Sequence, residues 1–402
     1  MTKWRFVYRF FLFLVFVFFT IEFSLRILRP DALDFYFLQK QYHTFEPTYF
    51  VDLEANADVT VKHFRDFFTM RFTTNEMGFR GSPKVNNSLP QIACIGDSIT
   101  MGFGVDDKET FCSRLDSYKD SQGQEYQSLN MGVDAYGPTA IAEKLEKFVD
   151  KLNIKLLYYL PSPGDDIDDA IFQARREDRI KYNTFKWQFL STKHSYAMMG
   201  LRITQEQLVY RFRETFVWPY EKLLRSKKCH LQADKNSCSD VYRWPGWKRY
   251  IQEEFTFTKG PTLKELQTTS VGLVGGIEKA CKDKPDTSAK NVSPKILQAI
   301  DRIRSITEKH GIRLVLLATP VEVETAYCAH LGKFHPYYDY ILSLKKLLLA
   351  KDYEFLDMND YAKRMGVDKL GRPNVRPYYI YGDGHYTKKG HDWIYEVISK
   401  KT

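Results

Sequence analysis

Short apolar runs alternate with amphipathic stretches from residue 89 to the end of the chain. Continuous apolar runs predict buried strands, and apolar positions three and four residues apart predict helices. The predicted strands cover residues 91–95, 126–131, 154–160, 313–318 and 353–357. The predicted helices cover residues 109–118, 139–152, 294–310, 338–350 and 387–400. Strands and helices that alternate in this way favour a parallel sheet with helices on both faces.

The N-terminus differs most from a water-soluble composition. Phe10–Ile21 is apolar apart from Thr20, and with its flanking residues it approaches the length that crosses a bilayer. Lysine and arginine residues before this run favour a cytoplasmic N-terminus. We therefore expect a single-pass membrane helix whose attached body is periplasmic or otherwise extracytoplasmic. The alternative is a buried or interfacial helix of a cytosolic protein.

Changes in composition divide the chain into five parts. They are an anchor (1–30), a juxtamembrane lead-in segment (31–88), a first core part (89–170), an insertion (171–290) and a second core part (291–402). The insertion is aromatic and charged, which is untypical of a disordered linker. We expect it to be largely helical and to pack over the rim of the sheet. It is either a lid that stacks on sugar or acyl groups, or plain structural packing.

Charge and cysteine content exclude some functions. The net charge is +9, and the basic residues form short clusters without a long basic stripe, which argues against nucleic-acid binding. Cys94 lies in an apolar strand, so we expect an inert core thiol. Cys229 could pair with Cys238, and Cys281 with Cys328, in an oxidising compartment. No cysteine or histidine spacing indicates a metal site.

Candidate catalytic residues follow the ends of the predicted strands, which meet at one edge of a parallel sheet. Ser98 follows the first strand, and a serine nucleophile needs a base such as His385. Asp383 is available to orient that imidazole. The backbone N–H groups of Ser98 and Gly137 are candidate oxyanion donors. Each feature alone is also explained as a strand-end turn, a surface histidine or a helix cap; their order along the chain favours catalysis.

The motifs around these residues resemble those of the SGNH/GDSL hydrolase family. Gly96–Val105 resembles its first motif, Asn130–Thr139 its second and Asp383–His391 its last. The anchor and the turn at Asn75–Gly81 are similar to the membrane-attached members. The resemblance implies a three-layer α/β/α fold with a flavodoxin-like, five-stranded parallel sheet. It also implies ester hydrolysis or acyl transfer without a cofactor.

Carried onto this sequence, the resemblance implies Ser98 as nucleophile, His385 as base, Asp383 as its partner, and Ser98 and Gly137 as oxyanion donors. One position departs from the family, whose third motif reads Gly-Asn-Asp where this chain has Gly164-Asp165-Asp166. An ionised Asp165 cannot donate to an oxyanion. Either Asp165 stays protonated and donates, or another group replaces it, or activity is weak or absent.

The sequence thus predicts a membrane-tethered serine esterase that acts on acyl groups of cell-envelope glycans or lipids through an acyl-enzyme on Ser98. One alternative is an O-acyltransferase. Another is a catalytically impaired protein of the same fold that binds an extracellular polymer or assists its modification. The expected partners are the acylated glycan or lipid and the membrane.

Overall fold

The computed structural model describes residues 2–212, 281–380 and 384–400. The chain forms two compact units. The smaller unit contains the described residues 2–41 and 183–212, and the larger one contains residues 42–182 and the described residues after 280.

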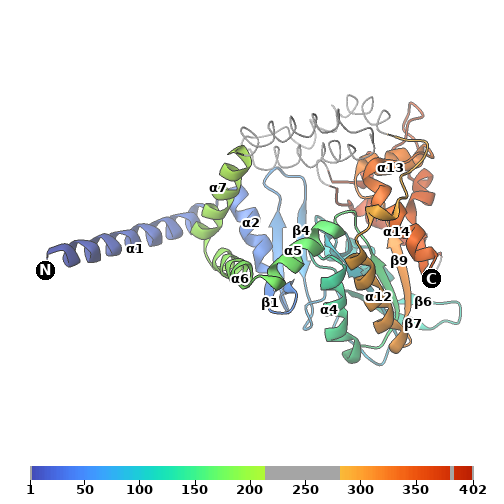
Figure 1. The fold of residues 1–402 in the computed structure, drawn as a ribbon, viewed down its shortest axis with the longest axis horizontal. Helices are drawn as coiled ribbons and strands as arrows, with labels where there is room; N and C mark the ends of the chain where they lie inside the picture. The colour runs from blue at the N-terminus through green and yellow to red at the C-terminus, as the bar shows by residue number, and fades with distance from the viewer. Residues whose placement is uncertain (1, 213–280, 381–383, 401–402) are drawn as a thin grey trace. The chain divides into compact units, whose positions relative to one another are not determined.

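A six-stranded sheet organises the larger unit, with the strand order β10-β9-β8-β5-β7-β6 (Figure 1). The strands are β5 (Gln91–Gly96), β6 (Tyr118–Lys119), β7 (Glu125–Asn130), β8 (Ile154–Leu160), β9 (Arg313–Ala318) and β10 (Glu354–Asp357). Neighbouring strands are parallel, except that β6 pairs antiparallel with β7. The mostly parallel α/β sheet is confirmed, but it has six strands where the sequence predicts five. The sixth strand has only two residues, too few to leave a pattern in the sequence.

Four of the five predicted helices are present, near residues 139–152, 294–310, 338–350 and 387–400, and two more follow β8 and β9. They are α4 (Pro138–Phe148), α5 (Asp165–Glu177), α12 (Pro294–Lys309), α13 (Val323–His330), α14 (Asp339–Leu349) and α15 (Lys388–Ile398). Short 3-10 turns link them: η3 (Val149–Lys151), η8 (Ala289–Asn291), η9 (Pro336–Tyr338), η10 (Met358–Met365) and η11 (Arg376–Tyr378). The start of α12 is fixed by Ser293, whose side chain accepts a hydrogen bond from the N–H of Lys295, with proline as the first helical residue.

The core lies on the central strands, where β5 is buried along its whole length. Alternate residues of a strand face opposite sides of a sheet. One set, including Ile92, Tyr158 and Val315, packs in a cluster with Trp393 and Ile394 of α15. The residues that alternate with this set along the central strands are buried as well. The sheet is therefore covered on both faces.

The predicted helix at residues 109–118 is wrong. The segment forms two 3-10 turns, η1 (Asp107–Glu109) and η2 (Ser113–Leu115). The hydroxyl of Thr110 donates to Ser113 Oγ and accepts from the N–H of Ser113, and such local side-chain bonds compete with a regular helix.

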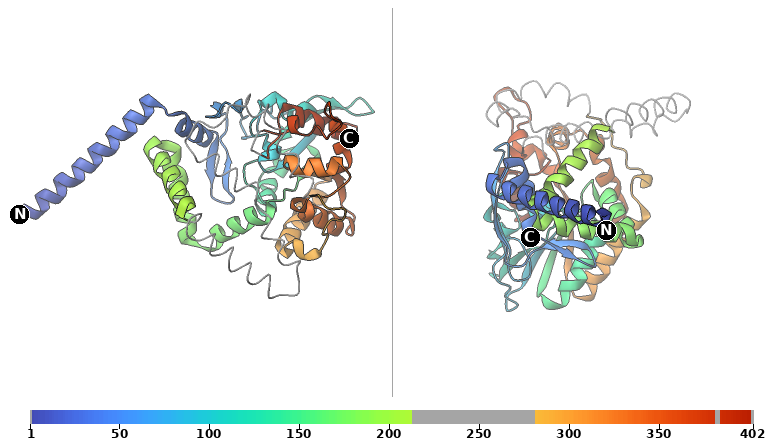
Figure 2. Two further views of the ribbon diagram at one scale, coloured as in Figure 1. Left: turned by 90° about the horizontal axis from the view of Figure 1, so that it is seen from above. Right: turned by 90° about the vertical axis from the view of Figure 1, so that its left-hand side faces the viewer.

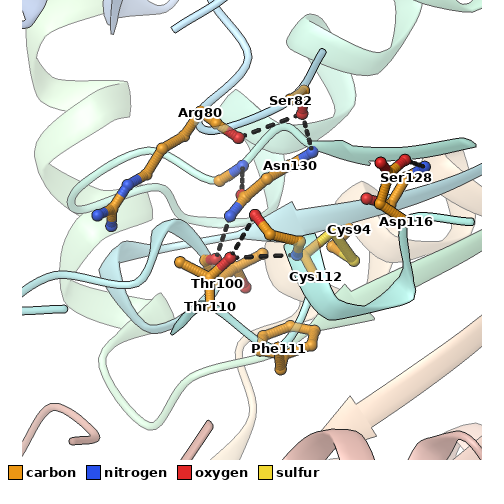
Figure 3. The surroundings of a disulfide bond; sticks show 12 residues. Arg80, Ser82, Cys94, Thr100, Thr110, Phe111, Cys112, Asp116, Ser128 and Asn130 are labelled. Atoms are coloured by element: carbon orange, nitrogen blue, oxygen red, sulfur yellow. Dashed lines mark hydrogen bonds between the residues drawn. A yellow bond between two sulfur atoms is a disulfide. The ribbon is translucent and has the colours of Figure 1, made fainter. Parts of the chain in front are cut away.

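Cys94 is also not a free thiol, because it forms a disulfide with Cys112 (Cα–Cα 6.1 Å) (Figure 3). The bond ties the central strand to the start of η2. Strand periodicity identified Cys94 as buried but carries no information about which distant residue lies beside it. The second disulfide that the structure describes, Cys281–Cys328, is one of the two pairs anticipated from the sequence. Cys229 and Cys238 lie outside the described residues.

The lead-in segment contributes four strands to the larger unit. They are β1 (His43–Glu46), β2 (Phe50–Leu53), β3 (Asp58–Lys62) and β4 (Thr69–Thr73). β1 pairs antiparallel with β2, and β3 with β4. The turn at Asn75–Gly81 follows. In it the side chain of Asn75 accepts hydrogen bonds from the N–H groups of Met77 and Phe79.

The smaller unit is helical in its described part. It contains α1 (Thr2–Leu28), α2 (Asp31–Gln41), most of α6 (Arg179–His194) and α7 (Tyr196–Phe212). Both views in Figure 2 show α1 as one unbroken helix. Its stretch Trp4–Leu28 is long and apolar enough to cross a membrane, and none of that stretch is buried in protein. The insertion is helical from residue 171 to 212, interrupted only at Asp178 and Ser195; residues 213–280, with Trp218, Trp244 and Trp247, lie outside the described residues.

Candidate active site

The candidate nucleophile lies where the central strand ends. Ser98 is the first residue of the short helix α3 (Ser98–Met101), directly after β5. Asp97 caps this helix, because its carboxylate accepts a hydrogen bond from the N–H of Ile99 at 2.9 Å. A Cβ on Gly96 would lie 2.3 Å from Thr100 Oγ1, so a larger residue at this position would displace the side chain of Thr100.

His385 reaches the serine from the other end of the chain. Its Nε2 lies 2.7 Å from Ser98 Oγ, a hydrogen bond between residues 287 positions apart. The ring also contacts Phe103, with 4.9 Å between the ring centroids. The proximity of the hydroxyl and the imidazole, which the sequence could only suggest, is therefore present in the structure.

The loop that carries His385 is held on both sides. The carbonyl oxygen of His385 accepts from the N–H of Ile380 at 2.8 Å. The hydroxyl of Tyr386 donates to the carbonyl of Pro320 at 2.7 Å, which joins this loop to the end of β9. Thr387, the first residue of the predicted helix, caps α15. Asp383, the predicted partner of His385, lies outside the described residues.

Gly137 is buried at the start of α4, where it acts as the N-cap residue. A Cβ at this position would lie 2.8 Å from the backbone nitrogen of Asp169, so the glycine permits close packing of α4 against α5. The carboxylate of Asp169 in turn accepts from the N–H of Thr139 at 3.0 Å. These contacts explain the glycine by packing, and its role as an oxyanion donor stays a prediction.

Asp165 is buried at the first position of α5. The hydroxyl of Tyr159, on β8, donates to Asp165 Oδ2 at 3.3 Å. Burial, together with the nearby charge of Asp97, raises the pKa of Asp165 well above its ordinary value. This direction favours the protonated form of the side chain, and whether Asp165 donates to an oxyanion stays a prediction.

Two more carboxyl groups near the serine have raised pKa values. Burial is the main cause for Asp97, whose pKa is raised although the N–H of Ile99 opposes the shift. Burial and the charge of Asp97 raise the pKa of Asp168 to about 7. Perturbed carboxyl groups of this kind are typical of functional sites, and structural networks produce them too. Among the residues that the structure describes, no cluster of His, Cys, Asp and Glu side chains has the arrangement of a metal site.

The sequence missed the residues that hold the nucleophile helix in place. Arg80 is fully buried, and its guanidinium donates to the carbonyl oxygens of Met101 (2.8 Å), Gly102 and Val105, directly after the serine. Its Nε pairs with Asp107 Oδ1 at 3.0 Å. Asn130 adds a donor, since its Nδ2 lies 3.0 Å from the carbonyl of Thr100. Figure 3 shows Arg80 and Asn130 together beside the Cys94–Cys112 disulfide.

Four carbonyl groups at the end of α3 and in the following turn thus receive bonds from these two side chains. We call Arg80 and Asn130 the helix clamp. The turn at Asn75–Gly81 was noted in the sequence only as part of a resemblance, and a single buried arginine leaves no periodic signal that would reveal its target.

Comparison with known proteins adds little to this picture. No protein-family model matches the chain, and no curated protein matches it. Among solved structures, one similar chain is described as a lipolytic protein of the G-D-S-L family from Desulfitobacterium hafniense DCB-2. It is 10% identical, and the alignment covers 79% of this chain and 100% of that one with a TM-score of 0.35.

Proposed function

We propose that this chain is an SGNH/GDSL-type serine hydrolase that cleaves ester-linked acyl groups through an acyl-enzyme on Ser98. The observation that carries the proposal is the 2.7 Å contact between Ser98 Oγ and His385 Nε2 at the carboxyl end of a parallel sheet. A serine in hydrogen-bond reach of an imidazole is the minimal arrangement for nucleophilic catalysis. The three-layer α/β/α arrangement of that family is part of the proposal.

The chemistry follows from this geometry. His385 takes the proton of Ser98 as the hydroxyl attacks the ester carbonyl, and returns it to the departing alcohol when the intermediate collapses. Water, activated by the same imidazole, then releases the acid and regenerates Ser98. Asp383 orients the imidazole, and the N–H groups of Ser98 and Gly137 stabilise the oxyanion. An acceptor hydroxyl in place of water would make the same enzyme an O-acyltransferase.

Asp165 completes the oxyanion site in this proposal. A protonated carboxyl is a hydrogen-bond donor, so the raised pKa of Asp165 lets it replace the asparagine amide of the family. The same residue supports the second candidate function. If Asp165 does not donate, the protein is catalytically impaired and binds an extracellular polymer or assists its modification.

The setting of the proposed enzyme is a membrane surface outside the cytoplasm. The exposed apolar helix α1 would anchor the chain, and the two described disulfides fit an oxidising compartment. We therefore propose acylated glycans or lipids of the cell envelope as substrates.

Labelling with a fluorophosphonate probe tests the nucleophile, because the probe reacts with an activated serine. The native chain should be labelled, Ser98→Ala should not, and His385→Gln should be labelled at least about 10²-fold more slowly because the general base is gone. Ser113→Ala is a matched control that leaves labelling intact. Equal labelling of Ser98→Ala and the native chain would remove Ser98 from the mechanism. A native chain that is folded but unlabelled would favour the binding protein.

A further inference from the structure

Within the smaller unit, the C-terminal part of α1 is bound to the N-terminus of α7 by a set of polar contacts. Glu22 of α1 accepts hydrogen bonds from Ser195 Oγ at 2.7 Å and from the N–H of Ala197 at 2.8 Å. The N–H of Tyr196 donates to the same carboxylate at 3.2 Å. A carboxylate from one helix thus caps the N-terminus of another, where free N–H groups and the helix dipole favour negative charge.

Arg26, one turn further along α1, adds to these contacts. Together they form the joint between α1 and α7. Its guanidinium pairs with Glu22 at 2.7 Å and donates to the carbonyl of His194 at 2.8 Å. The guanidinium also lies over the ring of Tyr196, 5.6 Å from its centroid. The two charged residues in the C-terminal half of α1, Glu22 and Arg26, are therefore both used to hold the start of α7.

The position of this joint along α1 determines how deep the joint would lie in a membrane that α1 crosses. The hydrocarbon layer of a bilayer is about 30 Å thick, which corresponds to about 20 helical residues. Counted from Trp4, the first residue of the apolar stretch, such a span ends next to Glu22. If α1 crosses a membrane, Glu22 and Arg26 lie at headgroup level, and so does the N-terminus of α7. Figure 1 shows α7 beside this end of α1.

α7 has two apolar faces, and among the residues that the structure describes only one of them is packed against protein. Tyr196, Met199 and Ile203 are buried with residues of α2 such as Phe37. On another side of the helix, Leu201, Leu208 and Val209 are 61%, 64% and 45% exposed. Their spacing of seven and eight residues places the three side chains along one stripe. An exposed stripe on a helix that begins at headgroup level has the features of a helix lying in the membrane interface.

We propose that the stripe Leu201, Leu208 and Val209 of α7 inserts into the headgroup–acyl boundary of the membrane that α1 crosses, with Glu22 and Arg26 fixing its depth. The inference rests on the membrane anchor of the proposed function and does not depend on the proposed chemistry. The stripe on α7 is then a second contact between the chain and the membrane. The lipids that it touches belong to the leaflet in which Glu22 and Arg26 lie. The unit that carries the insertion is then held against the bilayer rather than at the end of a free tether.

Depth-dependent quenching tests the proposal on the full chain in phospholipid vesicles. An environment-sensitive NBD fluorophore is attached to the variant Leu208→Cys, to Glu206→Cys as the matched exposed polar position on the same helix, or to Phe16→Cys within α1. The unsubstituted chain, treated with the same reagent, gives the background. Vesicles with and without lipid carrying a nitroxide near the headgroup or deeper in the acyl chain report contact with lipid.

We expect NBD at position 208 to be quenched by the shallow nitroxide at least about threefold more strongly than NBD at position 206. NBD at position 16 should be quenched by the deep nitroxide. Glu22→Gln should reduce quenching at position 208 and leave it unchanged at position 16, since it weakens the joint without altering the span.

Quenching at position 16 with none at position 208 overturns the proposal and leaves the anchor intact. A blue-shifted but unquenched signal at position 208 also overturns it, because protein then covers the stripe. No quenching at either position refutes the anchor and this inference together, while the labelling of Ser98 is a separate measurement that would still test the hydrolase.

Discussion

Replacing Arg80 by lysine tests whether the helix clamp positions the nucleophile. The guanidinium of Arg80 bonds to three backbone carbonyls and to Asp107 Oδ1, and it is fully buried. A lysine has one nitrogen and cannot reach these dispersed acceptors at once. We expect at least two buried acceptors to lose their partner.

The size of the effect follows from those contacts. Each buried acceptor left without a partner costs about 1–3 kcal/mol, so Arg80→Lys should lower the free energy of unfolding by about 2–6 kcal/mol. The activity should fall as well. A displacement of the reacting atom by about 1 Å costs about 10²-fold in rate, and the turn held by Arg80 directly follows Ser98.

The assay combines thermal unfolding in detergent with the rate of fluorophosphonate labelling, measured well below the unfolding transition. Arg71→Lys is the matched control, because Arg71 makes an exposed ion pair with Asp58 on the neighbouring strand. It should change stability by no more than about 1 kcal/mol and leave labelling unchanged. Asn130→Ala removes the other half of the clamp and serves as a second variant if Arg80→Lys does not fold. A folded Arg80→Lys protein with native labelling would refute the positioning role and reduce Arg80 to a stabilising residue.

Two further predictions concern the carboxyl groups near Ser98. Asp168 has a pKa raised to about 7, so the folded state keeps a proton that the unfolded state releases near pH 4, and stability is lost as the pH rises through this window. Asp168→Asn lacks this loss, and its advantage in free energy of unfolding over the native chain should grow between pH 5 and pH 8 by at most about 3 kcal/mol; an advantage that does not change with pH would contradict the assigned cause. Asp165→Asn should keep or raise the hydrolysis of a short-chain ester, because an amide of similar size is a hydrogen-bond donor, whereas Asp165→Ala should lose about 10²–10³-fold if the side chain donates to the oxyanion. A loss of activity in Asp165→Asn would show that the carboxyl has a role of its own.

The sequence predicted the sheet well because buried parallel strands leave continuous apolar runs. Residues 154–160, for example, coincide with β8. The prediction from the sequence failed for features that depend on contacts that hydrophobic periodicity does not report. The partner of Cys94 and the replacement of the helix at 109–118 by 3-10 turns both follow from local or tertiary contacts that hydrophobic periodicity does not encode.

The candidate site could also be predicted from the sequence only in part. Ser98 and His385 were found because strand-end turns and a helix cap mark their positions, and the distance between them could only come from coordinates. The pKa of Asp165 was left open by the sequence, since burial and the charge of Asp97 depend on the fold. Asp383 remains a prediction.

The helix clamp changes how the lead-in segment (31–88) should be interpreted. The sequence suggested a lead-in segment between the anchor and the core, but β1–β4 and the turn with Arg80 belong to the larger unit. Arg80 lies at the end of this segment and bonds directly to the turn that follows Ser98. A nucleophile helix of only four residues has little stability of its own. Its geometry therefore depends on residues that precede the central strand, and a fragment starting at residue 89 should label poorly even if its sheet forms.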